Sequence, residues 1–207
     1  MSTGMYLPTV APPVAPLSRI DPQPKRWTCE EFHDLGDRGV FEHARVMLID
    51  GEILVSPMSN PPHATASSLI EEFVRPIFAK GFVVRIEKSL VLSQTTDPVP
   101  DVAVVSGSIR DYALAHPTTA VFVIEISDTS LDYDTNDKAS LYASAGIADY
   151  WVVDLVNRQL IVHRNPQVDA SKPFGFTYAN VTVHLPGQNV APLAAPNSSA
   201  RVDDLLP

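Results

Sequence analysis

A chain of 207 residues with 45% apolar residues and a mean hydropathy near zero is long enough for one soluble domain with a sizeable core. Its formal net charge of -9 argues against a protein that holds nucleic acid by bulk electrostatics, because neutralising phosphates requires clustered Lys and Arg. Any function directed at nucleic acid therefore needs a local basic patch, a partner or a bound metal.

Cysteine usage and the N-terminus indicate the compartment. The single cysteine, Cys29, cannot form an internal disulfide, and no Cys/His group has zinc-finger spacing. The chain begins without the charged flank and apolar core of a signal peptide, and no apolar run approaches the ~20 residues of a membrane-spanning helix. We expect a reducing, cytoplasmic location and no contact with membranes.

The N-terminal part of the chain differs in composition from the rest. Six of the 19 prolines fall within residues 1–24, where few residues could build a periodic apolar face. We therefore predict a disordered Pro-rich arm at residues 1–25, a single folded domain at residues 26–190 and a C-terminal tail at residues 191–207.

The first predicted elements of the domain are a short helix and a hairpin. Thr28 followed by Glu31 has the spacing of a capping box, which predicts a helix from there to about residue 37. The dipeptide Asp50-Gly51 is a favoured tight turn between two apolar segments, which predicts a β-hairpin. Its strands are residues 45–49 and 52–56.

A longer helix follows the pair Pro61-Pro62. Apolar residues recur at helical spacing from Ala66 to Phe78, and Gly81 is a suitable end. This pattern predicts a helix with one buried face. Two short strands are predicted next, over residues 82–86 and 89–93.

The second half of the chain contains apolar runs rich in Val and Ile, which predict strands covered on both faces by helices. The predicted elements are strands over 101–105 and 120–126, a helix over 134–145, strands over 150–154 and 159–163, and weaker strands over 174–178 and 181–185. Strands that alternate with helices predict an α/β fold with a mixed central β-sheet flanked by helices.

Two of these runs carry a carboxylate at a strand end, Asp101 and Glu125, and Lys138 lies on the following helix. A buried charge needs a cleft, an ion or a partner, so each acid could instead form a helix cap or a salt bridge. Together, two carboxylates and a lysine are sufficient to hold Mg²⁺ and a water beside a phosphodiester. Carboxylate pairs also suit glycoside hydrolysis, but the sequence has only two tryptophans to serve as sugar platforms.

An ordered set of short motifs over residues 26–165 resembles the Uma2 family of endonucleases, formerly a domain of unknown function. Besides the three residues above, the motifs are Trp27, Glu30-Glu31-Phe32, Leu48-Ile49-Asp50-Gly51-Glu52, Pro62-His63-Ala64, Thr129-Ser130-Leu131, Asp134, Leu141-Tyr142-Ala143, Ala145-Gly146-Ile147 and Tyr150-Trp151 with Asp154.

The resemblance implies the restriction-endonuclease-like fold of the PD-(D/E)xK superfamily, commonly assembled as a homodimer. It also implies that Asp101 and Glu125 are ligands of Mg²⁺ or Mn²⁺. The superfamily's usual lysine, two residues after the glutamate, is replaced by Ser127. The resemblance assigns its role to Lys138.

Five positions leave alternatives open. The family usually has a glutamate where this chain has Met47, and Glu87 is either a substitute carboxylate or a surface residue. His63 is either an auxiliary group that contacts phosphate or metal-bound water, or a residue whose ring caps the helix start. Tyr142, four residues after Lys138, either supports the lysine or packs in the core, and Asp134 either caps the helix or forms the loop, with metal ligation a minor alternative.

Two classes of function remain. The first is a metal-dependent endonuclease that hydrolyses phosphodiester bonds in DNA, with Asp101, Glu125, Lys138 and His63 in the site. The second is a catalytically degraded, dimeric binding or scaffolding module with the same fold. The retained acids and lysine favour the first, whereas Met47 and the acidic charge of the chain favour the second.

Overall fold

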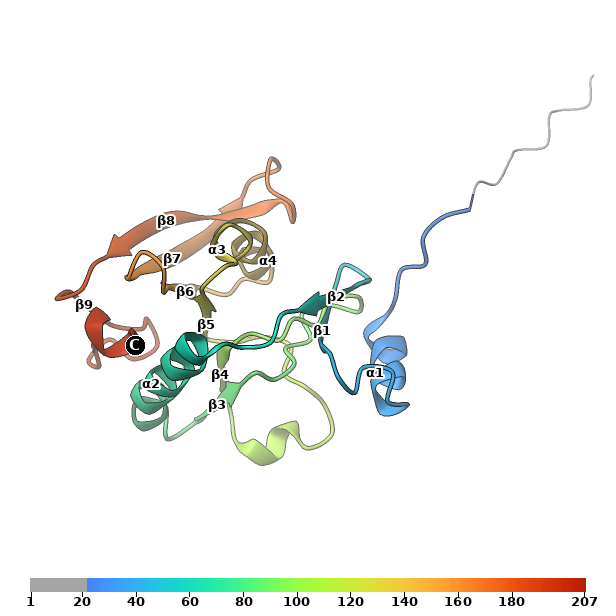
Figure 1. Ribbon diagram of the computed structural model, residues 1–207, viewed down its shortest axis with the longest axis horizontal. Helices are drawn as coiled ribbons and strands as arrows, with labels where there is room; N and C mark the ends of the chain where they lie inside the picture. Colours follow the sequence, from blue (N-terminus) through green and yellow to red (C-terminus); the bar gives the residue numbers. More distant parts are fainter. Residues whose placement is uncertain (1–21) are drawn as a thin grey trace, which may run out of the picture.

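The computed structural model describes residues 22–207, so the expected arm lies outside the described residues except for 22–25, which form no helix or strand (Figure 1). Helix α1 (Cys29–Asp37) follows, and its N-terminus is the predicted capping box. The backbone N–H of Glu31 donates to the Thr28 hydroxyl, and the Glu31 carboxylate accepts from the Thr28 N–H.

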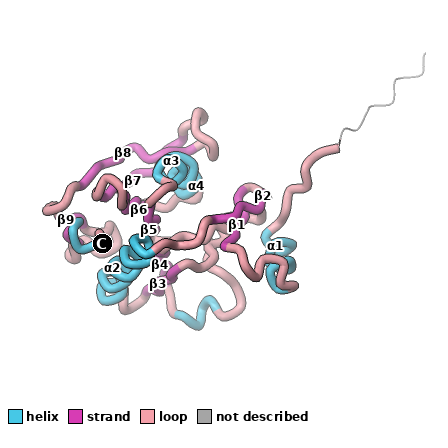
Figure 2. The backbone as a smooth tube through the Cα atoms, in the orientation of Figure 1, coloured by secondary structure: helices cyan, strands magenta, loops and turns pink. Residues whose placement is uncertain are grey.

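The predicted hairpin is confirmed as strands β1 (Arg45–Ile49) and β2 (Glu52–Ser56). Asp50 and Gly51 both have positive φ, 46° and 75°, as a two-residue turn of this kind requires. In the view of Figure 2 the hairpin separates α1 from the larger sheet.

Six strands form the central sheet in the order β3-β4-β5-β6-β7-β8. They are β3 (Phe82–Ile86), β4 (Val102–Ser106), β5 (Phe122–Ser127), β6 (Asp149–Asp154), β7 (Gln159–Val168) and β8 (Phe176–His184). Strands β5 and β6 pair in parallel and the other neighbours are antiparallel. The predicted mixed sheet, with its central strands contributed by the region 101–155, is confirmed.

Helices cover both faces of this sheet. Helix α2 (Pro61–Ile77) packs on one face, and a continuous helical segment packs on the other. The segment consists of α3 (Leu131–Tyr133), a π-helical turn η2 (Asp134–Lys138) and α4 (Ala139–Ser144). It therefore begins three residues before the predicted helix at 134–145 and contains a change of helical pitch.

Strand alternation decides which side chains meet which helix. In β5, Phe122 and Ile124 pack in the core beneath α2, whereas Val123 packs in the core beneath α4. The same alternation puts Glu125 on the α4 side, where its carboxylate contacts Lys138 and Tyr142. A charged residue inside a fully buried strand thus faces the helix that carries its partners.

One predicted strand, residues 89–93, is wrong. In place of a strand ladder, the backbone N–H groups of this segment donate to carbonyls of separate stretches: Leu90 to Pro98, Val91 to Pro117, and Leu92 and Ser93 to Thr96. The segment beside it contains Pro98 and Pro100, which have no N–H to donate, so a regular ladder cannot extend there.

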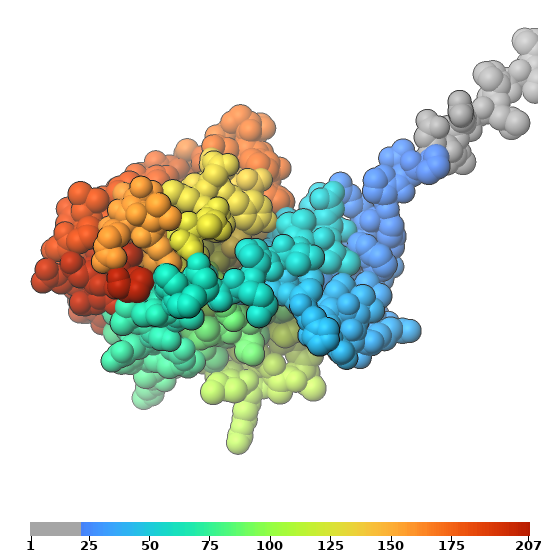
Figure 3. All heavy atoms as spheres, viewed as in Figure 1, coloured from blue at the N-terminus to red at the C-terminus, as the bar shows by residue number. Residues whose placement is uncertain are grey.

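The C-terminal residues belong to the core rather than lying free of it. Strand β9 (Asn189–Val190) pairs with β10 (Ala200–Arg201), and the 3₁₀ turn η3 (Val202–Leu205) follows. Another 3₁₀ turn, η1 (Ile109–Tyr112), lies elsewhere, between β4 and β5. Val202 and Leu205 are buried with Ile70 and Val74 of α2. Figure 3 shows the red C-terminal residues against the green α2 region, at the opposite end of the molecule from α1.

No helix within residues 22–207 is long and apolar enough to cross a membrane.

The packing of the C-terminal segment predicts that Leu205→Ala destabilises the fold. Leu205 is fully buried, so truncation leaves a cavity and should cost about 2–5 kcal/mol in the free energy of unfolding, measured with chemical denaturant. Leu114→Ala, at a fully exposed position, is the matched control. Equal stability of the two variants would contradict the observed packing.

A buried histidine predicts acid sensitivity of the fold. Burial lowers the pKa of His163 from its ordinary value of 6.5 to about 4. The unfolded chain therefore binds a proton that the folded chain does not, and stability falls by about 1.4 kcal/mol per unit as the pH drops from 6.5 towards 4. We expect His163→Phe to lose less stability than wild type between pH 7 and pH 5. The exposed His43→Phe variant should follow wild type.

Candidate active site

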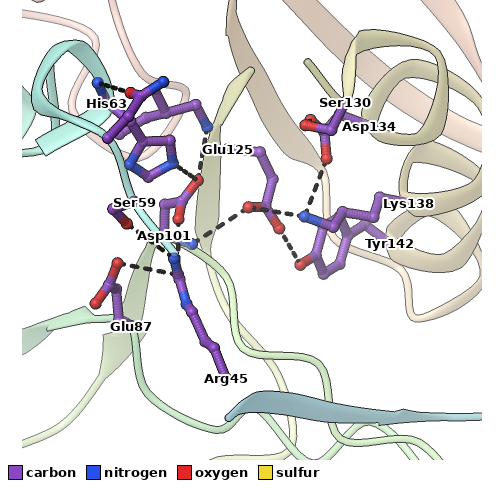
Figure 4. Close-up of polar contacts among 12 residues, drawn as sticks. Arg45, Ser59, His63, Glu87, Asp101, Glu125, Ser130, Asp134, Lys138 and Tyr142 are labelled. Carbon is purple, nitrogen blue, oxygen red and sulfur yellow. Dashed lines mark hydrogen bonds and ion pairs between the residues drawn. The ribbon is translucent and has the colours of Figure 1, made fainter. Parts of the chain in front are cut away.

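A cavity of about 470 Å³ opens between the hairpin, the N-terminus of α2 and the ends of β4 and β5. All four residues predicted from the sequence, His63, Asp101, Glu125 and Lys138, line it. Figure 4 shows their side chains converging from separate elements. The structure thus brings together groups that are up to 75 residues apart in the chain.

Strand pairing brings the two acids together. The β4–β5 register ends with Val102 opposite Ile124, so Asp101 and Glu125 follow as the next neighbours on the α4 face. The Asp101 N–H donates to Glu125 Oε2 at 3.3 Å, and the Ile126 N–H donates to Asp101 Oδ2 at 2.8 Å. Only 5% of Asp101 and 1% of Glu125 is exposed, so these carboxylates sit in a low-dielectric environment.

Lys138 reaches the acids from the last residue of the π-helical turn. Its Nζ lies 3.1 Å from Glu125 Oε2 and 2.9 Å from Asp134 Oδ1. Tyr142, four residues further on, donates its hydroxyl to Glu125 Oε1 at 2.7 Å. Asp134 and Tyr142 therefore position the lysine and the glutamate respectively. Ser127, at the superfamily's usual lysine position, is buried, and its hydroxyl has no hydrogen-bond partner among residues 22–207.

His63 contacts Asp101 rather than capping its helix. The cap of α2 is Asn60, whose side-chain oxygen accepts from the His63 N–H at 3.1 Å. The His63 imidazole does not cap the helix, and its Nε2 lies 3.3 Å from Asp101 Oδ2. Of the two alternatives drawn from the sequence, the capping ring is therefore wrong.

Arg45 is a site residue that the sequence did not single out. Its guanidinium lies 3.1 Å from Asp101 Oδ1 and 3.0 Å from Glu87 Oε1. Glu87 thus belongs to the same charge network but does not line the cavity, whereas the buried Met47 does. The available signal was the position of Arg45 two residues before Met47, since residues i and i+2 of a strand share a face.

Burial and neighbouring charges shift the pKa values of the two acids in opposite directions. Burial would raise the pKa of Asp101, but the hydrogen bond and charge of His63, with Lys138 and the Ile126 N–H, lower it to about 2. Burial raises the pKa of Glu125 above its usual range, while the charge of Lys138 opposes that rise. The two carboxylates are thus unequal, as acids with different roles often are.

Neighbouring acids raise the pKa values of both bases in the site. Burial would lower the pKa of Lys138, but the charges of Glu125 and Asp134 raise it above its usual range. The hydrogen bond to Asp101 raises the pKa of His63, with burial opposing it. Lys138 is therefore a hydrogen-bond donor and a positive charge, not a proton acceptor.

The donor set suits a hard cation that keeps several waters. Within residues 22–207 no group of three His, Cys, Asp or Glu side chains is arranged to hold a metal ion, which excludes a closed cage of such ligands there. Asp101 Oδ1 and Glu125 Oε1 each have one partner, so each retains a lone pair. Mg²⁺ typically binds through one or two carboxylates, and these two residues fit that requirement.

The buried ion cluster predicts a large effect of Lys138→Met on stability. The change leaves the buried Asp134 without its counter-charge and Glu125 without its ammonium partner, and should cost about 3–5 kcal/mol in the free energy of unfolding, measured with denaturant. Adding Glu125→Gln should recover part of this loss, because a neutral amide needs no positive partner whereas an ionisable carboxyl group does. The exposed Lys80→Met is the control. If Lys138→Met unfolded at the same denaturant concentration as Lys80→Met, the ion cluster would be refuted.

Comparison with known proteins places the chain in a family. The profile of the Uma2 family, described as "putative restriction endonuclease", matches residues 29–202. The crystal structure of a protein from Anabaena variabilis, described as a putative nuclease belonging to DUF820, superposes with a TM-score of 0.62 at 19% identity, covering 86% of this chain and 96% of that one. It therefore shares the fold. No curated protein matches the sequence. The profile match spans most of the folded part of the chain, so this protein belongs to the Uma2 family.

Proposed function

We propose that this protein is a nuclease, and specifically a metal-dependent endonuclease that hydrolyses phosphodiester bonds in DNA. The observation that carries the proposal is the meeting of Asp101, Glu125 and the Lys138 ammonium at one cavity wall. The family description supports the same reaction class.

Asp101 and Glu125 are the proposed ligands of Mg²⁺ or Mn²⁺. The bound cation would supply Lewis-acid polarisation of the scissile phosphate. The unequal acidities fit this role, because Asp101 remains a carboxylate over the physiological pH range and offers a permanent negative charge. The Ile126 N–H fixes the orientation of that carboxylate before any ligand enters.

Lys138 is the proposed electrostatic catalyst. Its raised pKa keeps the ammonium charged, so it can donate hydrogen bonds to the attacking water or to the phosphate oxygens as negative charge develops on them. Asp134 holds the ammonium at 2.9 Å and limits the directions in which it can move. This pre-organisation is what an electrostatic role requires.

His63 is the proposed auxiliary group. Its Nε2 contact with Asp101 orients that carboxylate, and the ring lines the cavity where a phosphate would enter. The raised pKa of His63 increases the fraction of positive charge near neutral pH, which favours an anionic substrate. Assembly as a homodimer is a further proposal that rests on the family resemblance.

A catalytically degraded binding module is the second candidate, and two observations favour it. Met47 presents a thioether on the cavity wall where the family usually has a carboxylate. Both oxygens of Asp101 already accept contacts from Arg45, His63 and the Ile126 N–H. A cation must therefore compete with protein groups for this residue.

The nuclease proposal predicts that supercoiled plasmid DNA is nicked in the presence of Mg²⁺ or Mn²⁺ and that EDTA stops the reaction. Asp101→Asn and Glu125→Gln should each lower the rate at least about 100-fold, since each replaces a carboxylate ligand of the cation with a neutral amide. Glu71→Gln, an exposed acid on α2, should retain full activity. Equal nicking by all four proteins would indicate a contaminant, and no nicking by wild type would favour the binding module.

A further inference from the structure

Arg45 occupies a position between two acids at the edge of the cavity. Its NH2 group lies 3.1 Å from Asp101 Oδ1 and 3.0 Å from Glu87 Oε1, and its NH1 group donates to the Ser59 hydroxyl at 3.1 Å. The side chain is 24% exposed and lines the cavity beside Asp101 (Figure 4). Its guanidinium can therefore reach a ligand in the cavity by changes in its own side chain.

We propose that Arg45 is the residue that binds a phosphate of the nucleic-acid backbone, and that Asp101 and Glu87 hold it until a divalent cation takes Asp101. This inference rests on the proposed function and adds to it the contact through which the substrate is held.

Competition for Asp101 is the first step. Asp101 Oδ2 is engaged by the Ile126 N–H and His63, so Oδ1 is the oxygen with the most remaining capacity, and Arg45 is its partner. A cation placed on Oδ1 would stand close to the guanidinium and repel it. Two positive groups cannot both keep their best position on one oxygen, so cation binding frees Arg45 from Asp101.

Glu87 controls how firmly Arg45 is then held. Its backbone has φ +48°, a left-handed conformation that is unfavourable for a residue other than glycine, and its N–H donates to the Asp101 carbonyl at 3.0 Å. This turn aims the carboxylate at Arg45. The Glu87 side chain is 41% exposed, so water weakens the remaining ion pair, and a phosphate can compete for the guanidinium.

Phosphate is the ligand class that fits. A guanidinium has a planar fork of donors that matches two phosphate oxygens, and it stays charged at all relevant pH values. The chain as a whole carries a net charge of -9, so attraction for a polyanion must come from local cations. Arg45 lines the cavity, and one of its two acidic partners, Glu87, lies outside the cavity and is partly exposed to solvent. Arg45 is therefore a cation that a phosphate in the cavity can reach.

The test compares Arg45→Ala with Arg75→Ala, which removes the same charge from an exposed pair with Glu71 on α2. Mn²⁺ binding is measured by calorimetry without DNA. Binding of a fluorescein-labelled 16-base-pair DNA duplex is measured by anisotropy with and without Ca²⁺, and gels verify that the duplex stays intact.

We expect Arg45→Ala to bind Mn²⁺ several-fold more tightly than wild type, because a competing cation is gone. With Ca²⁺ present it should bind the duplex about tenfold more weakly. The slope of log binding constant against log salt concentration should also be smaller in magnitude by about one, because one phosphate contact is lost. Without Ca²⁺ its weak duplex binding should equal that of wild type. Arg75→Ala should match wild type in Mn²⁺ affinity and in the effect of Ca²⁺.

Glu87→Gln provides a variant whose predicted effect cannot arise from misfolding. It removes the remaining acid that holds Arg45, so Ca²⁺-loaded protein should bind the duplex more tightly than wild type. If thermal denaturation shows that Arg45→Ala is unfolded, two other variants decide the question, Glu87→Gln and Arg45→Lys. Arg45→Lys keeps the positive charge but lacks the planar pair of guanidinium donors, so it should bind the duplex more weakly than wild type.

Different failures have different signatures. If Arg45→Ala and Arg75→Ala behave alike while wild type binds Mn²⁺ and duplex, Arg45 is structural and this inference is overturned with the nuclease proposal intact. If Arg45→Ala weakens duplex binding equally with and without Ca²⁺, the release of Arg45 by the cation is refuted. If wild type binds neither Mn²⁺ nor duplex, the proposed function fails and the inference falls with it.

Discussion

A lysine ammonium held between two buried carboxylates is the interaction on which the rest of the site depends. Lys138, Glu125 and Asp134 would each be costly to bury alone, and together they neutralise much of that cost. These contacts form only at one distance between β5 and the helical segment 131–144, and only when that segment is rotated about its axis so that Lys138 faces the strand. The π-helical turn that ends at Lys138 supplies the local change in pitch. The structure of the helix and the chemistry of the site are thus parts of one arrangement.

The same constraint explains which parts of the site were predictable from the sequence. Alternation along a buried strand places Glu125 on a defined face, and a carboxylate there needs a partner, so Lys138 could be predicted from the resemblance and from chemistry alike. Asp101 follows from its place at the start of the next apolar run. Strongly local signals, such as the Thr28 capping box and the Asp50-Gly51 turn, were also sufficient for their elements.

Contacts between distant segments were not predictable in this way. Arg45 is an ordinary strand residue in the sequence, and its role follows only from the distance between the hairpin and Asp101. The apolar segment 89–93 has the composition of a strand, but its neighbour contains Pro98 and Pro100 and cannot complete the ladder. The Pro- and Ser-rich composition after residue 190 concealed Val202 and Leu205, which pack beneath α2. In each case tertiary context outweighed local pattern.

The electrostatics of the cavity separate two kinds of positive charge. Lys138 is enclosed by two acids and tied to a rigid helical turn, whereas Arg45 is shared between a buried acid and a partly exposed one. A fixed charge suits stabilisation of a transition state, and a movable charge suits substrate binding. In an acidic chain, this division allows a polyanion to be attracted locally without a basic surface.

The proposed function requires Asp101 and Glu125 to hold one divalent cation together, beside Lys138. Anomalous diffraction from crystals soaked in Mn²⁺ would locate such a cation. We expect one anomalous peak within coordination distance of both carboxylates, about 2.1 Å as for hard divalent cations, with the Arg45 guanidinium moved away from Asp101. A cavity without an anomalous peak, in which Arg45 and Lys138 keep their contacts with the two acids, would show that these carboxylates do not form a metal site.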